Sequence, residues 1–104
     1  MNSHTHGMEN YNHLNFQLVL PLKPEQCCLL LNTICLAVQQ GRVFTPGQYA
    51  TEDIYSCAFR LQLVEETDRE VLRLIMPDSS FRFPENPLCE APYKYQPEAK
   101  FYDL

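Results

Sequence analysis

The chain has 104 residues, of which 45% are hydrophobic and 12% aromatic, and its formal net charge at pH 7 is −5. This length supports one domain with a core of its own, and the apolar content argues against intrinsic disorder. The eight Lys and Arg residues are scattered and form no run, so direct binding of nucleic acid is not expected.

The N-terminal residues, the longest apolar stretch and the cysteines favour a cellular location for the protein. Residues 1–13 are polar and lack the basic and apolar regions of a secretory signal peptide, so we predict a flexible polar N-terminus there. The longest apolar-rich stretch, Cys27 to Val38, is shorter than the roughly 20 residues that span a bilayer, so no membrane contact is expected. The five cysteines are expected to be free thiols in a reducing compartment. These features predict a soluble, cytoplasmic protein.

The first predicted element is a short strand over residues 15–20. Phe16, Leu18 and Leu20 alternate with other residues, which is typical of a strand with one buried face. Pro21 follows and is expected to end the strand, because it cannot donate a backbone hydrogen bond to a sheet.

A helix is predicted next, over residues 24–40. Pro24 stands at its start and Gly41 follows it, which is the usual distribution of proline and glycine at helix ends. Apolar residues occur on nearly every side, so we expect this helix to be buried almost all round. Short apolar runs do not distinguish helix from strand by periodicity alone, and two strands, 27–31 and 34–38, are the alternative.

Residues 43–57 are predicted to form a loop. They contain the turn sequence Thr-Pro-Gly at 45–47, and mostly polar residues follow it. The hydroxyl of Thr51 before two acidic residues is a weak signal for a short helical turn.

The clearest local unit is a β-hairpin formed by residues 58–64 and 70–76. Both segments alternate apolar and polar residues, so their apolar side chains are expected to share one face of a sheet. Three acidic residues near the tip, Glu65, Glu66 and Asp68, are expected to be solvated. They are unsuited to acid–base catalysis, which needs a partly buried carboxyl group, and are instead candidates for contact with a basic partner surface. The alternative is a solvated turn that discourages edge pairing.

The last stretch, residues 77–104, contains five of the eight prolines and six of the twelve aromatic residues. Proline removes a backbone donor and favours extended geometry, so no helix is expected there. A third antiparallel strand is predicted over 80–84, and residues 88–104 are predicted to form an extended tail whose last ten residues contact a partner. The candidate partner-binding residues of this tail are aromatic: Tyr93, Tyr95, Phe101 and Tyr102.

Together these elements predict a single α+β domain over residues 14–87, with one helix packed on an antiparallel sheet of about three to four strands. A small all-β barrel is the alternative if residues 27–38 form a hairpin.

Cys27, Cys28 and Cys35 are the candidate residues for thiol or metal chemistry. Two adjacent cysteines and one more on a helix do not form a zinc framework, and all three histidines lie in the first thirteen residues, so no base is expected beside a thiol. We expect these thiols to pack as small hydrophobic groups, and we expect no metal or cofactor.

The leading functional hypothesis is a protein–protein interaction module without catalytic activity, such as an adaptor, small chaperone or regulatory subunit. It would use the C-terminal tail, a sheet edge or the acidic hairpin tip. Two alternatives are a thiol- or metal-dependent protein that uses Cys27, Cys28 or Cys35, and a small acidic inhibitor of a nucleic-acid-binding protein. A sheet edge or an exposed helix is also suited to forming a homodimer.

Overall fold

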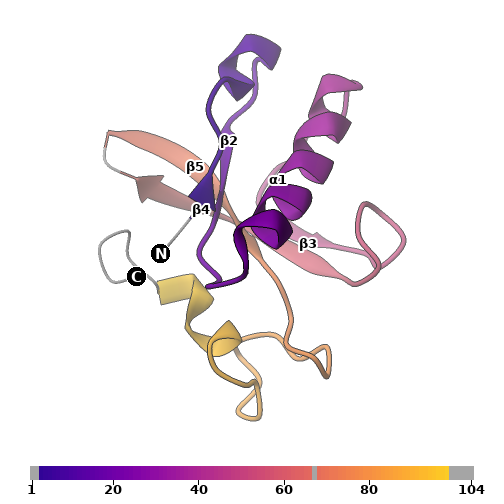
Figure 1. The fold of residues 1–104 in the computed structure, drawn as a ribbon, viewed down its shortest axis with the longest axis vertical. Coiled ribbons are helices and arrows are strands. Elements are labelled where there is room, and N and C mark those ends of the chain that lie inside the picture. Colours follow the sequence, from indigo (N-terminus) through magenta and orange to yellow (C-terminus); the bar gives the residue numbers. More distant parts are fainter. Residues whose placement is uncertain (1–2, 67, 99–104) are drawn as a thin grey trace.

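One main helix lies against an open, mixed five-stranded sheet in the computed structural model, which describes residues 3–66 and 68–98 (Figure 1). The strand order across the sheet is β1-β2-β5-β4-β3. In chain order the elements are β1 (Ser3–His4), the 3-10 helix η1 (Met8–Tyr11), β2 (Asn15–Leu18), α1 (Pro24–Gln39), β3 (Gly47–Tyr49), β4 (Phe59–Glu66), β5 (Arg69–Ile75) and the 3-10 helix η2 (Tyr93–Glu98). The prediction of an α+β fold is confirmed, and the barrel alternative is wrong.

The sheet is mixed, whereas the sequence led us to expect an antiparallel one. β2 and β5 are parallel neighbours, and the other three pairings are antiparallel. The chain leaves β2 through α1 and re-enters the sheet at the far edge as β3. β4 then pairs antiparallel with β3, and β5 pairs antiparallel with β4. β5 therefore lies beside β2 and runs parallel to it. This pairing depends on the long connection through α1, which alternation along one strand does not reveal.

The helix prediction is confirmed at both ends of α1. The side-chain Oε1 of Gln26 accepts a hydrogen bond from the backbone N–H of Lys23 at 3.3 Å, and Pro24 occupies the first turn. At the other end Gly41 adopts a left-handed conformation with φ of 102° and donates its N–H to the carbonyl of Val38. A residue with a Cβ is strained in that conformation, which explains why glycine ends the helix.

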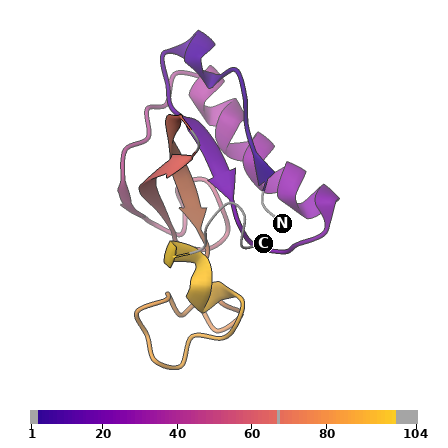
Figure 2. The same ribbon diagram turned by 90° about the vertical axis from the view of Figure 1, so that its left-hand side faces the viewer.

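The core lies between α1 and one face of the sheet (Figure 2). Phe16 of β2, Ile34 of α1, Phe59 of β4 and Leu74 of β5 are all fully buried. Burial of each such side chain contributes about 1.5–3 kcal/mol. The outer side of α1 is not buried, so the expectation of a helix buried nearly all round is wrong. Leucines occur on both the buried and the exposed side of α1, so the periodicity of apolar residues could not distinguish the two sides.

The β4–β5 hairpin prediction is confirmed, and the predicted apolar side chains share a face, since Leu61 pairs with Leu74 and Leu63 with Leu72. The opposite face is mixed, because Val64 pairs with Val71 there beside the pair of Gln62 and Arg73. The tip is shorter than expected, because β4 continues to Glu66. That carboxylate is only 5% exposed, and it lies 3.2 Å from Nδ1 of His4 and 3.5 Å from the guanidinium of Arg69. The prediction that Glu66 is solvated is therefore wrong.

Two strand predictions fail at short segments. β3 lies within the segment predicted to be a loop, and it is only three residues long. The strand predicted at 80–84 does not exist, because the carboxylate of Asp78 closes a turn there. It accepts hydrogen bonds from the backbone N–H groups of Ser80 and Arg82, and Phe81 takes a positive φ of 62° that a strand residue cannot adopt.

Both terminal segments contribute to the fold. Ser3 and His4 pair with β2, and Met8 of η1 is buried in the core. Cys89 and Gln96, from the segment predicted to be an extended tail, are buried as well. All five cysteines of the chain are free thiols. Within residues 3–66 and 68–98, no helix is long and apolar enough to cross a membrane.

Candidate protein-binding edge

One half of β4 has a partner on only one side. β3 pairs with Phe59–Leu61 and ends there, whereas β5 pairs with β4 as far as Glu66. Among the described residues, only β5 forms backbone pairs with the stretch from Gln62 to Glu66, which we call the open β4 edge. Alternate residues of such a stretch direct their N–H and C=O groups away from β5, where an added strand can bind them.

A hollow of about 530 Å³ lies at the junction where β3 stops and the open β4 edge begins. Its walls come from β3, β4, the end of β5 and two prolines of the C-terminal segment, Pro84 and Pro97. A second hollow, of about 560 Å³, shares these two prolines and extends to Pro87 and Tyr95. We call the two hollows together the proline groove. The proline groove continues from the sheet edge toward η2. An extended segment of a partner that pairs with β4 therefore has space in this groove for its own side chains.

Arg60 fixes one wall of the groove to the sheet. Its guanidinium donates to both carboxylate oxygens of Glu85, and its Nε donates to Oε1 of Gln48 at 3.0 Å. The same guanidinium lies 4.1 Å from the ring centroid of Phe83. The hydrogen bonds from Arg60 lower the pKa of Glu85, so this carboxylate stays ionised and paired.

η2 is docked on the sheet through the side chain of Gln96, which is 1% exposed. Its Oε1 accepts the N–H of Met76 at 2.9 Å, and its Nε2 donates to the carbonyl of Met76 at 2.6 Å and to that of Tyr93 at 2.8 Å. A side-chain amide thus takes the place of a neighbouring strand at the end of β5. This contact holds Pro97, which belongs to both hollows.

Arg73 supports η2 from within the sheet. Its Nε donates to Oε1 of Gln17 at 2.7 Å, and its Nη1 donates to the carbonyl of Gln96 at 2.8 Å. Burial lowers the pKa of Arg73, and the charge of Glu66 opposes this shift. A buried guanidinium bonded to a main-chain carbonyl of η2 makes displacement of this helix costly, because it would leave the donor without a partner.

Asp78 organises the loop that carries Pro84 and Pro87. It is almost fully buried and accepts four hydrogen bonds, from the backbone N–H groups of Ser80, Arg82 and Glu90 and from Nε of Arg82. Burial raises its pKa, but these hydrogen bonds outweigh that effect and lower the pKa to about 2. The loop is therefore closed around an ionised carboxylate.

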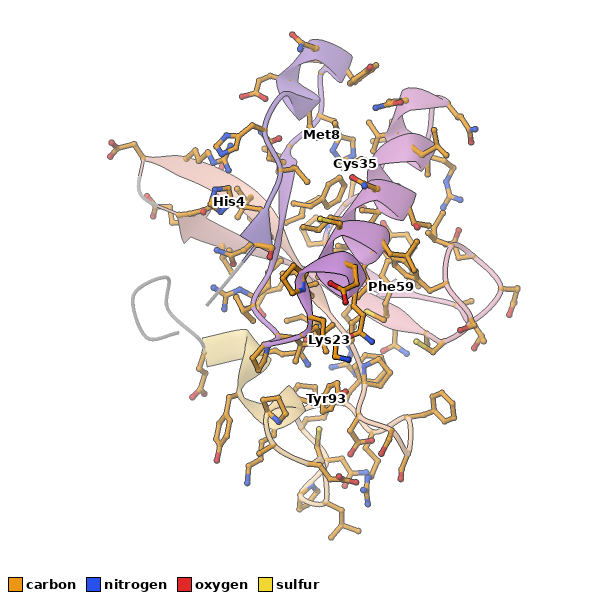
Figure 3. All side chains as sticks on the ribbon, viewed as in Figure 1. His4, Met8, Lys23, Cys35, Phe59 and Tyr93 are labelled. Carbon is orange, nitrogen blue, oxygen red and sulfur yellow. The ribbon has the colours of Figure 1, made fainter. Side chains whose placement is uncertain are left out.

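Two of the four predicted tail residues, Tyr93 and Tyr95, lie among the described residues, and their surroundings differ. Tyr95 is exposed and lines the proline groove, whereas Tyr93, the first residue of η2, packs against the core (Figure 3). Phe101 and Tyr102 lie outside the described residues. The prediction that the tail is free of helix is wrong, since η2 contains Pro97. A 3-10 helix needs few backbone donors and runs for only a few residues, so it tolerates proline better than an α-helix does.

The predicted acidic residues lie at the far end of the open β4 edge. Glu65 and Asp68 are exposed, and Glu70 pairs directly opposite Glu65. Glu66 points instead to His4 and Arg69 and is not available at the surface. The exposed acids give this end of the edge a negative charge.

The cysteines and histidines lie nearer to each other than the sequence suggested. A hollow of about 360 Å³ between the N-terminal segment and α1 is lined in part by His4, His6, Cys27, Cys28 and Cys35. In Figure 3, however, His4 lies toward the hairpin and apart from the Cys35 thiol on α1, whose pKa is raised by burial. A raised pKa disfavours the reactive thiolate. In the part of the chain that the structure describes, no three His, Cys, Asp or Glu side chains are arranged to hold a metal ion.

Sequence reasoning missed most of the groove. Its walls are single prolines and parts of short segments that are far apart in the chain, and no spacing rule connects them. In comparisons with known proteins, the chain matches no family model, and no curated protein or solved structure is significantly similar to it.

Proposed function

We propose that this protein is a protein–protein interaction module without catalytic activity, and that it binds an extended segment of another protein by strand addition at the open β4 edge. The observation that carries the proposal is the coincidence of an unpaired strand edge with a hollow at the same place. Main-chain hydrogen bonds of an added strand supply affinity, and an adjacent pocket for its side chains supplies specificity.

The chemistry of the walls defines the bound segment. At the β3 end the hollow offers Leu63, Ile75 and prolines, which suit an apolar anchor side chain. At the other end Glu65 and Asp68 are exposed, which suits a lysine or arginine. The preferred partner therefore presents an extended segment with an apolar residue at one end and a basic residue at the other.

The other edges of the sheet are less suitable for strand addition. β1 has two residues and β3 has three, and Pro46 precedes β3. The hydroxyl of Tyr49 also accepts a hydrogen bond from the N–H of Thr45 and donates one to the carbonyl of Thr45. Short strands and proline are common means of protecting a sheet edge, so the open half of β4 is the favoured docking position.

The experiment is a selection from a phage-displayed library of random linear peptides, followed by affinity measurement by fluorescence polarisation. The test variant is Leu63→Lys, since Leu63 lines the hollow and is 44% exposed. The matched control is Leu14→Lys, at a residue that is 39% exposed and does not line the groove. We expect selected peptides to lose at least about tenfold in affinity for Leu63→Lys and to bind Leu14→Lys as they bind the wild type.

A second variant, Glu65→Lys, tests the charge of the bound segment. It should weaken peptides that carry a basic residue, and the loss should shrink as salt screens the interaction. Failure of the library to yield any binder, or equal affinity of Leu63→Lys and wild type, would show that the proposal is wrong.

A further inference from the structure

The imidazole of His13 joins two segments that are far apart in the chain. Its Nε2 accepts a hydrogen bond from the backbone N–H of Phe44 at 2.9 Å, and its Nδ1 lies 2.8 Å from the carbonyl oxygen of Leu14. Figures 1 and 2 both show η1, which shortly precedes His13, beside the end of α1 from which the chain continues toward Phe44. One side chain therefore ties the N-terminal segment to the connection between α1 and β3.

The two backbone groups decide which ring nitrogen of His13 carries a hydrogen. A backbone N–H donates and a carbonyl oxygen accepts, so Nε2 presents its lone pair to Phe44 and Nδ1 donates to Leu14. The neutral imidazole meets both requirements in one tautomer. A protonated imidazole has a hydrogen on each nitrogen, so its Nε2 would direct a donor at the N–H of Phe44. The hydrogen bond to Phe44 therefore requires the neutral ring.

Aromatic rings hold the imidazole in this position. His13 stacks on Phe16 with the ring centroids 5.4 Å apart, and its centroid lies 6.2 Å from that of Phe44 in an edge-on contact. Phe44 is buried in the core and also contacts the ring of Tyr49, the last residue of β3, at 5.5 Å. The position of Phe44 thus supports β3, which forms part of the wall of the hollow at the open β4 edge.

The charged side chains of the neighbouring segments are bonded to other groups. In η1 the carboxylate of Glu9 accepts two hydrogen bonds from within the N-terminal segment. Arg42, whose guanidinium lies 4.8 Å from the ring centroid of Phe44, forms an ion pair with Asp53. The charged residue of α1 is Glu25, in its first turn, and β2 and β3 contain none. The tyrosines and thiols of these segments ionise chiefly at alkaline pH. In the part of the chain that the structure describes, no carboxylate bonds to the imidazole and favours its protonation.

We propose that His13 is a pH-sensitive switch: the neutral imidazole holds the segment before β3 against the N-terminal segment, and protonation releases it. Histidine is the side chain that ordinarily changes its charge between about pH 5 and 8. Water solvates both forms of the ring in the unfolded chain, whereas only the neutral form bonds to Phe44 in the folded chain. The unfolded chain therefore binds more protons at His13 in this range, so this contribution to stability is lost as the pH falls. The switch does not depend on the proposed function.

NMR spectroscopy of the full chain, labelled with nitrogen-15, tests the switch directly. At about pH 8 the ring of His13 should carry its hydrogen on Nδ1 and a lone pair on Nε2. As the pH is lowered to about 5, the amide signal of Phe44 should move with the same midpoint as the ring signals of His13. The hydrogen-exchange protection factor of Phe44 should fall at least about fivefold, as expected for the loss of one hydrogen bond. A hydrogen on Nε2 at about pH 8, or a Phe44 amide that does not follow the ring, would overturn the proposal.

Two variants separate this switch from other responses of the chain to acid. In His13→Gln a side-chain oxygen replaces Nε2 as the acceptor and does not titrate, so the protection of Phe44 should stay constant from about pH 8 to about pH 5. The matched control is His6→Gln, at an exposed histidine of the same segment whose ring faces Arg69, and it should keep the wild-type response of Phe44. Circular dichroism checks that both variants fold. An acid response of Phe44 that persists in His13→Gln, or that disappears in His6→Gln, would contradict the assignment to His13, and the wild-type titration decides the question if a variant does not fold.

Discussion

Replacement of Gln96 by alanine tests whether η2 is an integral part of the fold or an appendage. The side-chain amide of Gln96 satisfies both the N–H and the carbonyl of buried Met76. Alanine leaves both groups without a protein partner. An unsatisfied buried group costs about 1–3 kcal/mol, which places the upper bound for the pair at about 6 kcal/mol. Water that enters the vacated space will form hydrogen bonds with one or both of these backbone groups, which reduces the loss. We therefore expect the free energy of unfolding to fall by about 3 kcal/mol.

The assay is urea unfolding followed by circular dichroism, with Gln39→Ala as the matched control. Gln39 is exposed on α1, so its replacement should change the free energy of unfolding by less than about 0.5 kcal/mol. Gln96→Glu supplies a second test, because an ionised carboxylate can accept from the N–H of Met76 but cannot donate to its carbonyl. Burial and this carbonyl raise the pKa of the new carboxyl group, so stability should recover as the pH falls and the group becomes a donor.

A loss of less than about 0.5 kcal/mol for Gln96→Ala would refute the reasoning. It would mean that the contact between Gln96 and Met76 does not hold η2 on the sheet. The groove wall formed by Pro97 would then lack its main support.

Two further predictions concern the loop and the thiols. The pKa of Asp78 is about 2 in the folded protein and 3.8 ordinarily, so its contribution to stability is complete above this ordinary value and is lost as the pH falls toward 2. Asp78→Asn should be less stable at pH 7 and should show a flatter acid dependence in urea titrations; an unchanged acid dependence would contradict this. Cys28 is the one exposed thiol of the five, and burial raises the pKa of Cys35, Cys57 and Cys89. One thiol per native chain should therefore react quickly with Ellman's reagent, and Cys28→Ser should abolish this phase; a second fast thiol would contradict the structure.

Elements with strong local patterns were predicted well from sequence. The helix from Pro24 and the β4–β5 hairpin carry their own start, stop or alternation signals within a few residues. β3 has no such signal, because a three-residue strand beginning at Gly47 shows no alternation and is stabilised by its pairing with β4. Local propensity is a weak guide where pairing with a distant segment decides the structure.

The candidate site was less predictable than the fold. Burial of Glu66 depends on His4 at the other end of the chain, and docking of η2 depends on an amide of Gln96 that mimics a strand. Neither contact leaves a periodic pattern. Tyr95 was singled out as an aromatic residue among prolines, and it does line the groove. Its exposure could be guessed from composition, but its position beside Pro84 and Pro97 required the fold.

Amide hydrogen exchange with and without a selected peptide tests the central claim most directly. In the free protein, N–H groups of Gln62–Glu66 that face away from β5 should exchange faster than those that bond to β5. The account predicts that a bound peptide slows exchange of these outward N–H groups specifically, with little change on α1. Protection confined to α1 or the hairpin tip, or no protection on β4, would contradict strand addition at the open β4 edge.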